Sequence, residues 1–480
     1  MQVYPKNNSI FDLPYEKALY FDKGNPGKLV ATAGEKKLEI DVVDKFPLQS
    51  KDHLGPMGER GGIVFFNVAS KDGEMFRVGV RADQFAKITL LLVVESLPSL
   101  KPRAEAKPIT LALMGLTQQE YQSLLKYYND QKPYLETLTE PLFIKRDVPN
   151  LPRSLVYVPN GPLKGMYTLL KTHGTAREVG IGTYNLVTFA LSLDADLPLN
   201  TSHLKVFRSG KKSKLQSSES DVNKILLNDK DYFVVGVNFN YPGPIRSRTG
   251  TEERQRVLNQ PKAYIPREEN VEKVGYLMDY LEGGELFELI DACRFKLSFL
   301  QTIAFALKYT YALSVLHDKY EIVHSDQKTE NVFLTREGEP KIGDFGFADK
   351  KGNKSKIQGS PFYIAPEIVR AMLDDKEYTL DTPIDVWGLG LIFLSLIGGL
   401  KSWQILCRQE ENDDWEHMPK ELDNIKSIIL ERLKSKKSEL TSFIYVIDKC
   451  LQLDPDNRLR ALEIVNRLGV IYYALQQGNH

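Results

Sequence analysis

The chain has 480 residues, with 63 Lys plus Arg balanced by 63 Asp plus Glu, and it is 42% hydrophobic and 26% charged. These proportions are ordinary for a folded globular protein and exclude wholesale disorder and collagen-like repeats. A net charge of zero argues against a general polyanion binder, because affinity for phosphate backbones needs an excess of Lys and Arg. We therefore expect no nucleic-acid partner.

The cysteines and the apolar runs indicate the compartment. The cysteines are widely spaced and form no CxxC pair: Cys293, Cys407 and Cys450. This pattern predicts free thiols in a reducing compartment. Pro5 and Pro14 interrupt the stretch where a signal peptide would be apolar, so we predict a cytoplasmic chain. The longest apolar run, 386–400, is shorter than the roughly 18 residues that span a membrane, so it predicts a buried helix and no transmembrane segment.

The first third of the chain alternates short apolar runs with Gly, Pro and charged turns, which is typical of a β-rich domain. The predicted strands are 37–43, 62–69, 75–81, 88–95 and 109–113. Thr117 and Glu120 have the spacing of a capping box and predict a helix over QQEYQSLLKYY. Prolines then cluster near residue 150, so we predict a β-rich N-terminal domain of unknown function at 1–150 and a second domain at 151–480.

Within the second domain, strand-like segments dominate to about residue 280 and helical periodicity dominates from Gly284 onward. The sequence thus predicts an α+β class, with a β-rich lobe at 151–280 and a helical lobe at 281–480. The polar, arginine-rich segment 241–270 is interpreted as an inserted surface loop.

The residues that point most clearly to a particular reaction lie in two segments, IVHSDQKTEN (322–331) and KIGDFGFAD (341–349). An Asp that accepts a hydroxyl proton, an Asn five residues later and a further Asp in DFG form the arrangement of magnesium-dependent phosphoryl transfer. These residues are Asp326, Asn331 and Asp344. Oxygen donors of this kind are the ligands that Mg²⁺ prefers.

With GSPFYIAPE at 359–367, these motifs resemble those of eukaryotic-type Ser/Thr protein kinases, and the resemblance covers about residues 155–478. It implies a two-lobed protein kinase fold with an additional β-rich N-terminal domain. It also implies ATP and Mg²⁺ as cofactors and a protein substrate that is phosphorylated on Ser or Thr. Asn331 and Asp344 would hold the metal.

The resemblance extends to the predicted β-rich lobe, where Gly180, Gly182 and Val187 match the glycine-rich loop GxGxxGxV. Asn185 replaces the third glycine of that pattern, which predicts slower or weaker nucleotide handling. Lys205 follows on an alternating strand, where the family has its phosphate-pairing lysine.

A helix expected at 217–228 would supply the carboxylate that pairs with Lys205. Glu219 lies beside an apolar stripe and is the first choice, and Asp221 is the rival. If neither acid reaches Lys205, the ion pair of an active kinase is absent and activity is in doubt.

The segment VGYLMDYLEGGELF at 274–287 resembles the last strand of the small lobe and the hinge. By resemblance, Met278 is the gatekeeper, and the Asp279 carbonyl and the Leu281 amide bind the adenine edge. Glu285 would face the ribose.

Further residues are assigned by resemblance in the predicted helical lobe. Lys328 would neutralise the transferring phosphoryl group, and Ser360 would contact the catalytic loop; both are typical of Ser/Thr-directed members. Glu367 is expected to pair with Arg458, and Asp385 to cap the backbone of the catalytic loop.

Ser325 replaces the arginine of the usual HRD motif, so the cation that clamps a phosphorylated activation loop is missing. We therefore expect activity without loop phosphorylation. The alternatives are a pseudokinase scaffold that binds nucleotide and a small-molecule phosphotransferase. The unmatched N-terminal domain suggests a regulatory or host protein partner, as in a bacterial effector kinase of the Legionella type, which would place the chain in the host cytoplasm.

Overall fold

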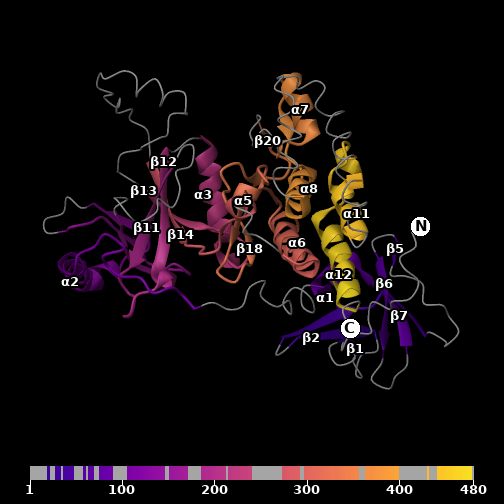
Figure 1. The fold of residues 1–480 in the computed structure, drawn as a ribbon, viewed down its shortest axis with the longest axis horizontal. Coiled ribbons are helices and arrows are strands. Elements are labelled where there is room, and N and C mark those ends of the chain that lie inside the picture. Colours follow the sequence, from indigo (N-terminus) through magenta and orange to yellow (C-terminus); the bar gives the residue numbers. More distant parts are fainter. Residues whose placement is uncertain are drawn as a thin grey trace. The chain divides into compact units, whose positions relative to one another are not determined.

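The computed structural model describes most of the chain and divides it into two compact units (Figure 1). The described residues are 19–21, 27–33, 36–47, 58–60, 63–69, 75–89, 105–145, 151–170, 185–211, 214–240, 273–291, 297–355, 363–398, 427, 430–431 and 440–477. We call residues 103–283 with 343–348 the strand-rich unit, and residues 1–102, 284–342 and 349–480 the catalytic-loop unit.

An antiparallel sheet of seven strands forms the centre of the strand-rich unit. Its strands, in spatial order, are β13 (Gly236–Asn240), β14 (Lys273–Asp279), β12 (Leu204–Lys211), β11 (Asn185–Ser192), β10 (Gly165–Leu169), β9 (Leu155–Val158) and β8 (Leu142–Ile144). Its two edge strands, β8 and β13, contact each other, which shows that the sheet curls.

The two faces of this sheet bury different clusters, because side chains alternate along a strand. On one face, Leu155 and Tyr157 of β9 pack with helix α2 (Gln118–Leu135). On the other, Val156 and Val158 pack with Phe207 and other residues of the central strands. We call the second face the inner face, because it lies inside the curled sheet, and the first the outer face.

Gly275 of β14 leaves space for an aromatic ring beside the central strands. It faces Phe239 of β13 and Ser209 of β12, and a Cβ at this position would collide with the ring of Phe207. Only glycine leaves room for that ring in the inner core. Phe207 therefore points inward, and its neighbours along β12 point outward.

Helix α2 begins as the sequence predicts. Thr117 is the N-cap, its hydroxyl accepts from the Glu120 amide at 3.1 Å, and the Glu120 carboxylate accepts from the Thr117 amide at 2.9 Å. Tyr121, Leu124 and Tyr128 of this helix are buried against the sheet. The predicted boundary at residue 150 therefore differs from the structure, in which α2 and β8 belong to the same compact unit as the strands that follow.

The remaining N-terminal elements belong to the catalytic-loop unit and are strand-rich, as predicted for this region. One sheet contains β1 (Leu19–Phe21), β2 (Lys28–Ala33) and β3 (Lys36–Asp41), and another contains β4 (Asp44–Pro47), β7 (Met75–Arg81), β6 (Ile63–Ala69) and β5 (Gly58–Arg60). Helix α1 (Ala82–Thr89) follows and contacts α12 (Ala461–Gln477).

One predicted strand of this region is wrong, and another is described only at its first two residues. Residues 88–89 of the predicted strand 88–95 end helix α1, and residues 90–95 lie outside the described part of the chain. The predicted strand 109–113 forms turns instead, in which the Met114 amide donates to the Thr110 and Leu111 carbonyls. The apolar run at 109–113 does not by itself distinguish a strand from a turn, and the local backbone bonds decide between them.

Helices dominate the rest of the catalytic-loop unit. They are α5 (Leu286–Asp291), α6 (Phe299–Ser314), α7 (Pro366–Leu373), α8 (Pro383–Gly398), α11 (Thr441–Cys450) and α12. Three small antiparallel sheets accompany them: β15 (Gly284–Glu285) with β17 (Val332–Leu334) and β18 (Pro340–Ile342), β16 (Ile322–Val323) with β19 (Asp349–Lys350), and β20 (Lys354–Ser355) with β21 (Tyr378–Thr379). The buried helix predicted from the apolar run 386–400 is confirmed as α8.

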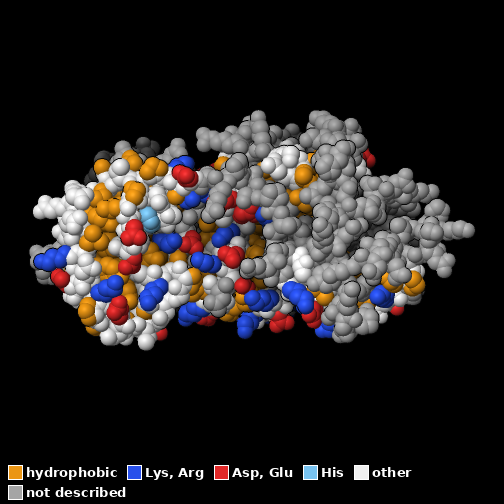
Figure 2. All heavy atoms as spheres, turned by 90° about the horizontal axis from the view of Figure 1, so that it is seen from below, with side chains coloured by type: hydrophobic (Ala, Val, Ile, Leu, Met, Phe, Trp, Pro, Cys, Tyr) orange, Lys and Arg blue, Asp and Glu red, His pale blue; other side chains and the backbone are white. Residues whose placement is uncertain are grey.

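Within the described residues, one helical stretch, Phe299–Lys319, is long and apolar enough to cross a membrane. Its apolar window is 67% buried inside the protein, which is typical of the core helix of a folded domain. On the strand-rich unit, some large hydrophobic side chains remain exposed, and Figure 2 shows hydrophobic side chains gathered at the left of the view. The exposed ones in this unit include Leu113, Tyr134, Leu197 and Ile225.

Candidate functional site

The catalytic loop brings three predicted residues together between β16 and β17. Asp326 is 3% exposed, and its Oδ2 lies 2.7 Å from the Lys328 Nζ. The Asn331 Nδ2 donates to the Asp326 carbonyl at 2.8 Å and to its Oδ2 at 3.2 Å. Since the amine side of the Asn331 amide is thus engaged, its oxygen is the atom suited to a metal ion.

Asp385 of α8 accepts hydrogen bonds from the backbone of this loop. Its Oδ2 accepts from the His324 amide at 2.7 Å, and its Oδ1 accepts from the Ser325 amide at 2.8 Å. The imidazole of His317 adds a contact of 2.8 Å to Oδ2. Ser325 has a φ of 67°, a left-handed conformation that costs energy for any residue except glycine, and the two bonds to Asp385 stabilise it. The predicted cap is confirmed.

Side chains that the sequence analysis did not single out support the same loop. The fully buried Tyr309 of α6 donates to the Gln327 Oε1 at 2.6 Å, and the hydroxyls of Thr329 and Tyr363 lie 2.9 Å apart. Burial, followed by the charge of Asp385, raises the pKa of Tyr309, so its hydroxyl remains a donor at neutral pH. No motif in the sequence marks Tyr309, whose role depends on a partner 18 residues away.

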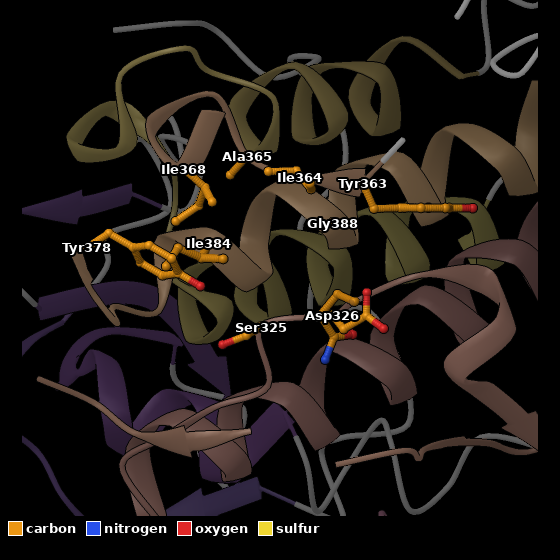
Figure 3. Close-up of a pocket in the computed structure, with 10 residues that line it drawn as sticks. Ser325, Asp326, Tyr363, Ile364, Ala365, Ile368, Tyr378, Ile384 and Gly388 are labelled. Atoms are coloured by element: carbon orange, nitrogen blue, oxygen red, sulfur yellow. The ribbon is translucent and has the colours of Figure 1, made fainter. Parts of the chain in front are cut away.

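A pocket lies beside Asp326. Figure 3 shows Ser325 and Asp326 on one side and Ile364 and Ala365 on the other. The Ser325 Oγ is buried and has no hydrogen-bond partner among the described residues. The full lining is Ser325, Asp326, Gln327, Tyr363, Ile364, Ala365, Ile368, Tyr378, Ile384 and Gly388.

The predicted pair between Glu367 and Arg458 is confirmed as a bidentate bridge. The Arg458 Nη1 and Nη2 donate to the two Glu367 carboxylate oxygens at 2.6 and 2.7 Å. The Arg458 side chain is fully buried and also donates to the Gln452 carbonyl. This bridge ties α7 to the loop before α12.

On the strand-rich unit, Lys205 does not make the ion pair that the sequence predicts. Its Nζ lies 2.8 Å from the Asp279 Oδ1, on the neighbouring strand β14. The side chain of Lys205 shares the inner face with Phe207, because the two positions differ by two residues. The predicted ion pair with Glu219 of α3 (Lys214–Leu226) is therefore absent, and Asp221 is exposed.

Glu219 instead pairs with Arg208, three positions beyond Lys205 and so on the outer face. The Arg208 Nη1 also lies 3.0 Å from the Asp344 Oδ1, so one guanidinium joins the helix carboxylate to the DFG aspartate. Its Cζ lies 5.1 Å from the centre of the Tyr276 ring. Glu219 is 2% exposed, and burial of that carboxylate requires a cationic partner.

Asp344 is held near Arg208 by its neighbour. Phe345 is buried and packs edge-on against Phe233, with ring centroids 5.9 Å apart. Asp344 itself has a φ of 59°, and its side chain is 45% exposed. Its carboxylate is a hard oxygen donor of the kind that Mg²⁺ prefers, and part of it stays exposed beside the contact with Arg208.

The structure describes only part of the predicted nucleotide site. Val187 faces Arg208 across β11 and β12, and Met278 lies two residues beyond Tyr276 on β14, so all of them share the outer face. Leu281 and Glu285 follow β14 and are partly buried. Gly180, Gly182 and Ser360 lie outside the described residues.

The register of the central strands identifies Arg208, which the sequence analysis missed. Paired residues of neighbouring strands share a face, and Met278 pairs with Val206, so a cation on the gatekeeper's side must lie an even number of residues from Val206. Arg208 meets this condition and Lys205 does not. The pairing of β12 with β14 supplies that register, and the sequence alone does not.

Comparison with known proteins agrees with the catalytic-loop geometry. Residues 264–468 match the family model described as the protein kinase domain. This match, together with the relatives described below, supports a eukaryotic-type Ser/Thr protein kinase domain. The match contains the catalytic loop, Asp344, Glu367 and Arg458 of this kinase domain, and it begins after Arg208 and Glu219.

The matched region is similar to several curated protein kinases. It is 37% identical over 127 residues to "Serine/threonine-protein kinase CLA4" of Candida albicans, covering 26% of this chain and 12% of that protein. It is 35% identical over 124 residues to the mouse "cAMP-dependent protein kinase catalytic subunit PRKX", covering 26% and 33% of the two chains. It is 26% identical over 218 residues to human "Serine/threonine-protein kinase PAK 4", covering 44% and 33%.

The chain thus spans a third or less of the length of these relatives. All three are eukaryotic kinases, so the prediction of a bacterial effector has no support in them.

Proposed function

We propose that this chain is an ATP- and Mg²⁺-dependent kinase that transfers the γ-phosphoryl group of ATP to Ser or Thr hydroxyls of a protein. The observation that carries the proposal is the cluster of Asp326, Lys328 and Asn331 on a loop whose backbone is fixed by Asp385. Phosphoryl transfer depends on positioning and on electrostatic stabilisation, and a rigid loop with these side chains provides both.

In this proposal, Asp326 orients the substrate hydroxyl and accepts its proton. Lys328 places its ammonium group 2.7 Å from the same carboxylate, where positive charge would neutralise the transferring phosphoryl group. The relatives named as Ser/Thr kinases support a Ser/Thr substrate.

Each of the two proposed metal ligands is chemically suited to magnesium. Asp344 offers a partly exposed carboxylate, and Asn331 offers an amide oxygen; both are hard oxygen ligands. Among the described residues, no group of three or more His, Cys, Asp or Glu side chains could hold a metal ion. This suits Mg²⁺, which is usually held by one or two protein ligands together with substrate phosphates. When bound, the ion would neutralise negative charge on those phosphates.

We further propose that activity does not depend on phosphorylation of the activation loop. The support is that position 325, beside Asp326, has a neutral hydroxyl where a clamping arginine would stand. Treating the purified protein with a phosphatase should leave the rate of substrate phosphorylation unchanged. A collapse of that rate would contradict this part of the proposal.

The direct test uses the full chain, γ-labelled ATP, Mg²⁺ and a generic basic protein substrate. Asp326→Asn should lower the rate of label transfer by about 10²- to 10⁴-fold, since it removes the general base. Asp374→Asn is the matched control, because Asp374 is exposed and pairs only locally with Lys376. The control should retain the wild-type rate.

Three results would overturn the proposal. Equal rates for wild type and Asp326→Asn would show that Asp326 is not the base. Nucleotide binding without label in any protein would favour a scaffold. Label in sugars or lipids but not in protein would favour a small-molecule phosphotransferase.

A further inference from the structure

We infer that Arg208, and not Lys205, is the side chain that binds the phosphates of the nucleotide. The inference rests on the proposed function for the identity of the ligand. It assigns an arginine of β12 to a role that the sequence motifs suggest for a lysine three residues earlier.

The first argument is the face of the sheet. Arg208 lies on the outer face with Val187 and Met278, the predicted nucleotide-contacting residues. Lys205 lies on the inner face beside the buried Phe207. A side chain cannot cross its own strand, so only Arg208 can meet a ligand that contacts Val187 and Met278.

The second argument is how each cation is held. The ammonium of Lys205 is paired with Asp279 at 2.8 Å, on the inner face. Arg208 is anchored by the buried Glu219 and by Asp344, and its guanidinium lies over the Tyr276 ring. Such an anchor fixes the direction of the remaining N–H donors. Of these, the buried Nε has no hydrogen-bond partner among the described residues.

The third argument is the chemistry of guanidinium. Arginine carries a permanent charge and presents five donors in a planar fork, which binds phosphate oxygens in pairs. Two carboxylates can therefore occupy part of the fork while other N–H groups remain for a phosphate. A lysine ammonium at the same place would act as a single point charge.

The test compares the binding of a non-hydrolysable ATP analogue with that of adenosine, measured by calorimetry on the full chain with Mg²⁺. Arg208→Ala should weaken binding of the triphosphate by about 10- to 100-fold, since it removes charge-assisted bonds to phosphate. Adenosine affinity should stay within about twofold, because adenosine lacks phosphates. Lys205→Ala should change neither affinity.

Arg208→Ala leaves Glu219 buried without its main cation, and this variant could fail to fold. The double variant Arg208→Met with Glu219→Gln removes both charges together and should show the same selective loss of triphosphate affinity. Arg208→Lys should restore part of that affinity, because it returns the charge without the fork.

Loss of triphosphate affinity in Lys205→Ala, with Arg208→Ala unaffected, would overturn the inference. So would an equal loss of both ligands in the double variant, which would indicate a purely structural role. A wild type that binds triphosphate through Arg208 but phosphorylates nothing would overturn the proposed function and uphold this inference. A wild type that binds no nucleotide would overturn both.

Discussion

The catalytic loop and the central strand β12 both carry candidate site residues. In the loop, residues that are close in sequence are also close in space, whereas on the strand they are not. In the loop, Asp326, Lys328 and Asn331 lie within six residues and contact each other directly. On β12, Lys205 and Arg208 are three residues apart and lie on opposite faces of the sheet. A motif therefore identifies the loop residues reliably, whereas a strand residue can be identified only when its register is known.

The same difference separates the two ion pairs that support these regions. The Arg458–Glu367 bridge, which was predicted, joins two recognisable motifs, APE and LDPDNR. The Arg208–Glu219 pair joins a strand and a helix with no motif of their own, and the sequence analysis assigned the wrong cation. The variants below test whether each region depends on the contacts assigned to it.

The largest expected effect is in the region that the sequence predicted. Arg458→Met leaves the Glu367 carboxylate without its bidentate partner and should lower the free energy of unfolding by roughly 3 kcal/mol. Urea unfolding followed by circular dichroism would measure it. Arg460→Met is the control, because that side chain is exposed and its pair with Glu463 is weak, so the change should stay below about 0.5 kcal/mol. Equal effects of the two variants would contradict the assignment.

The next effect tests the register that places Arg208 on the outer face. Gly275→Ala puts a methyl group into the ring of Phe207 and should cost about 1–3 kcal/mol of unfolding free energy through overpacking. The double variant Gly275→Ala with Phe207→Leu should recover part of that loss. The effects of the two substitutions on the free energy of unfolding should therefore be non-additive. Additive effects, or a neutral Gly275→Ala, would show that β12 and β14 do not pack as described.

A smaller effect tests the placement of helix α2 with the strand-rich unit. Thr117→Ala removes the N-cap hydroxyl that accepts from the Glu120 amide, and it should lower the free energy of unfolding by about 1 kcal/mol. Thr117→Ser keeps the hydroxyl and serves as the control. If α2 belongs to this unit, near-ultraviolet signals from the sheet tyrosines should melt at the lowered midpoint too. An unchanged tyrosine transition would place α2 outside it.

The smallest effect is a pH dependence at the same cap. The bond from the Thr117 amide, together with nearby Arg153, lowers the pKa of Glu120 below its ordinary value of 4.5. A carboxylate with a lowered folded-state pKa stabilises the protein above the unfolded-state pKa and loses that contribution as the pH falls through the folded one. Glu120→Gln should therefore be less stable than the wild type at neutral pH, with the gap closing below about pH 4.5. Urea midpoints between pH 3 and pH 7 would measure it, and a constant gap would contradict the shift.

Much of the site could be predicted from sequence because its parts are local. The helix cap at Thr117, the buried helix α8 and the loop residues around Asp326 each depend on neighbours within a few positions or on a strong apolar run. The β-rich character of the first third was also visible, but its boundary was not. Helix α2 joins the following strands through buried contacts of Tyr121 and Leu124, and such contacts leave no mark on the spacing of prolines.

The sequence by itself determined the kinase motifs, because Asp326, Lys328, Asn331 and Asp344 belong to short segments whose residue types and spacing are set by phosphoryl-transfer chemistry. Only the tertiary structure decided which cation on β12 meets Glu219. That choice depends on the pairing of β12 with β14 and on the ring of Phe207, for which Gly275 leaves room. Because strand faces alternate with every residue, a sequence distance of three separates the lysine that pairs with Asp279 from the arginine that pairs with Glu219.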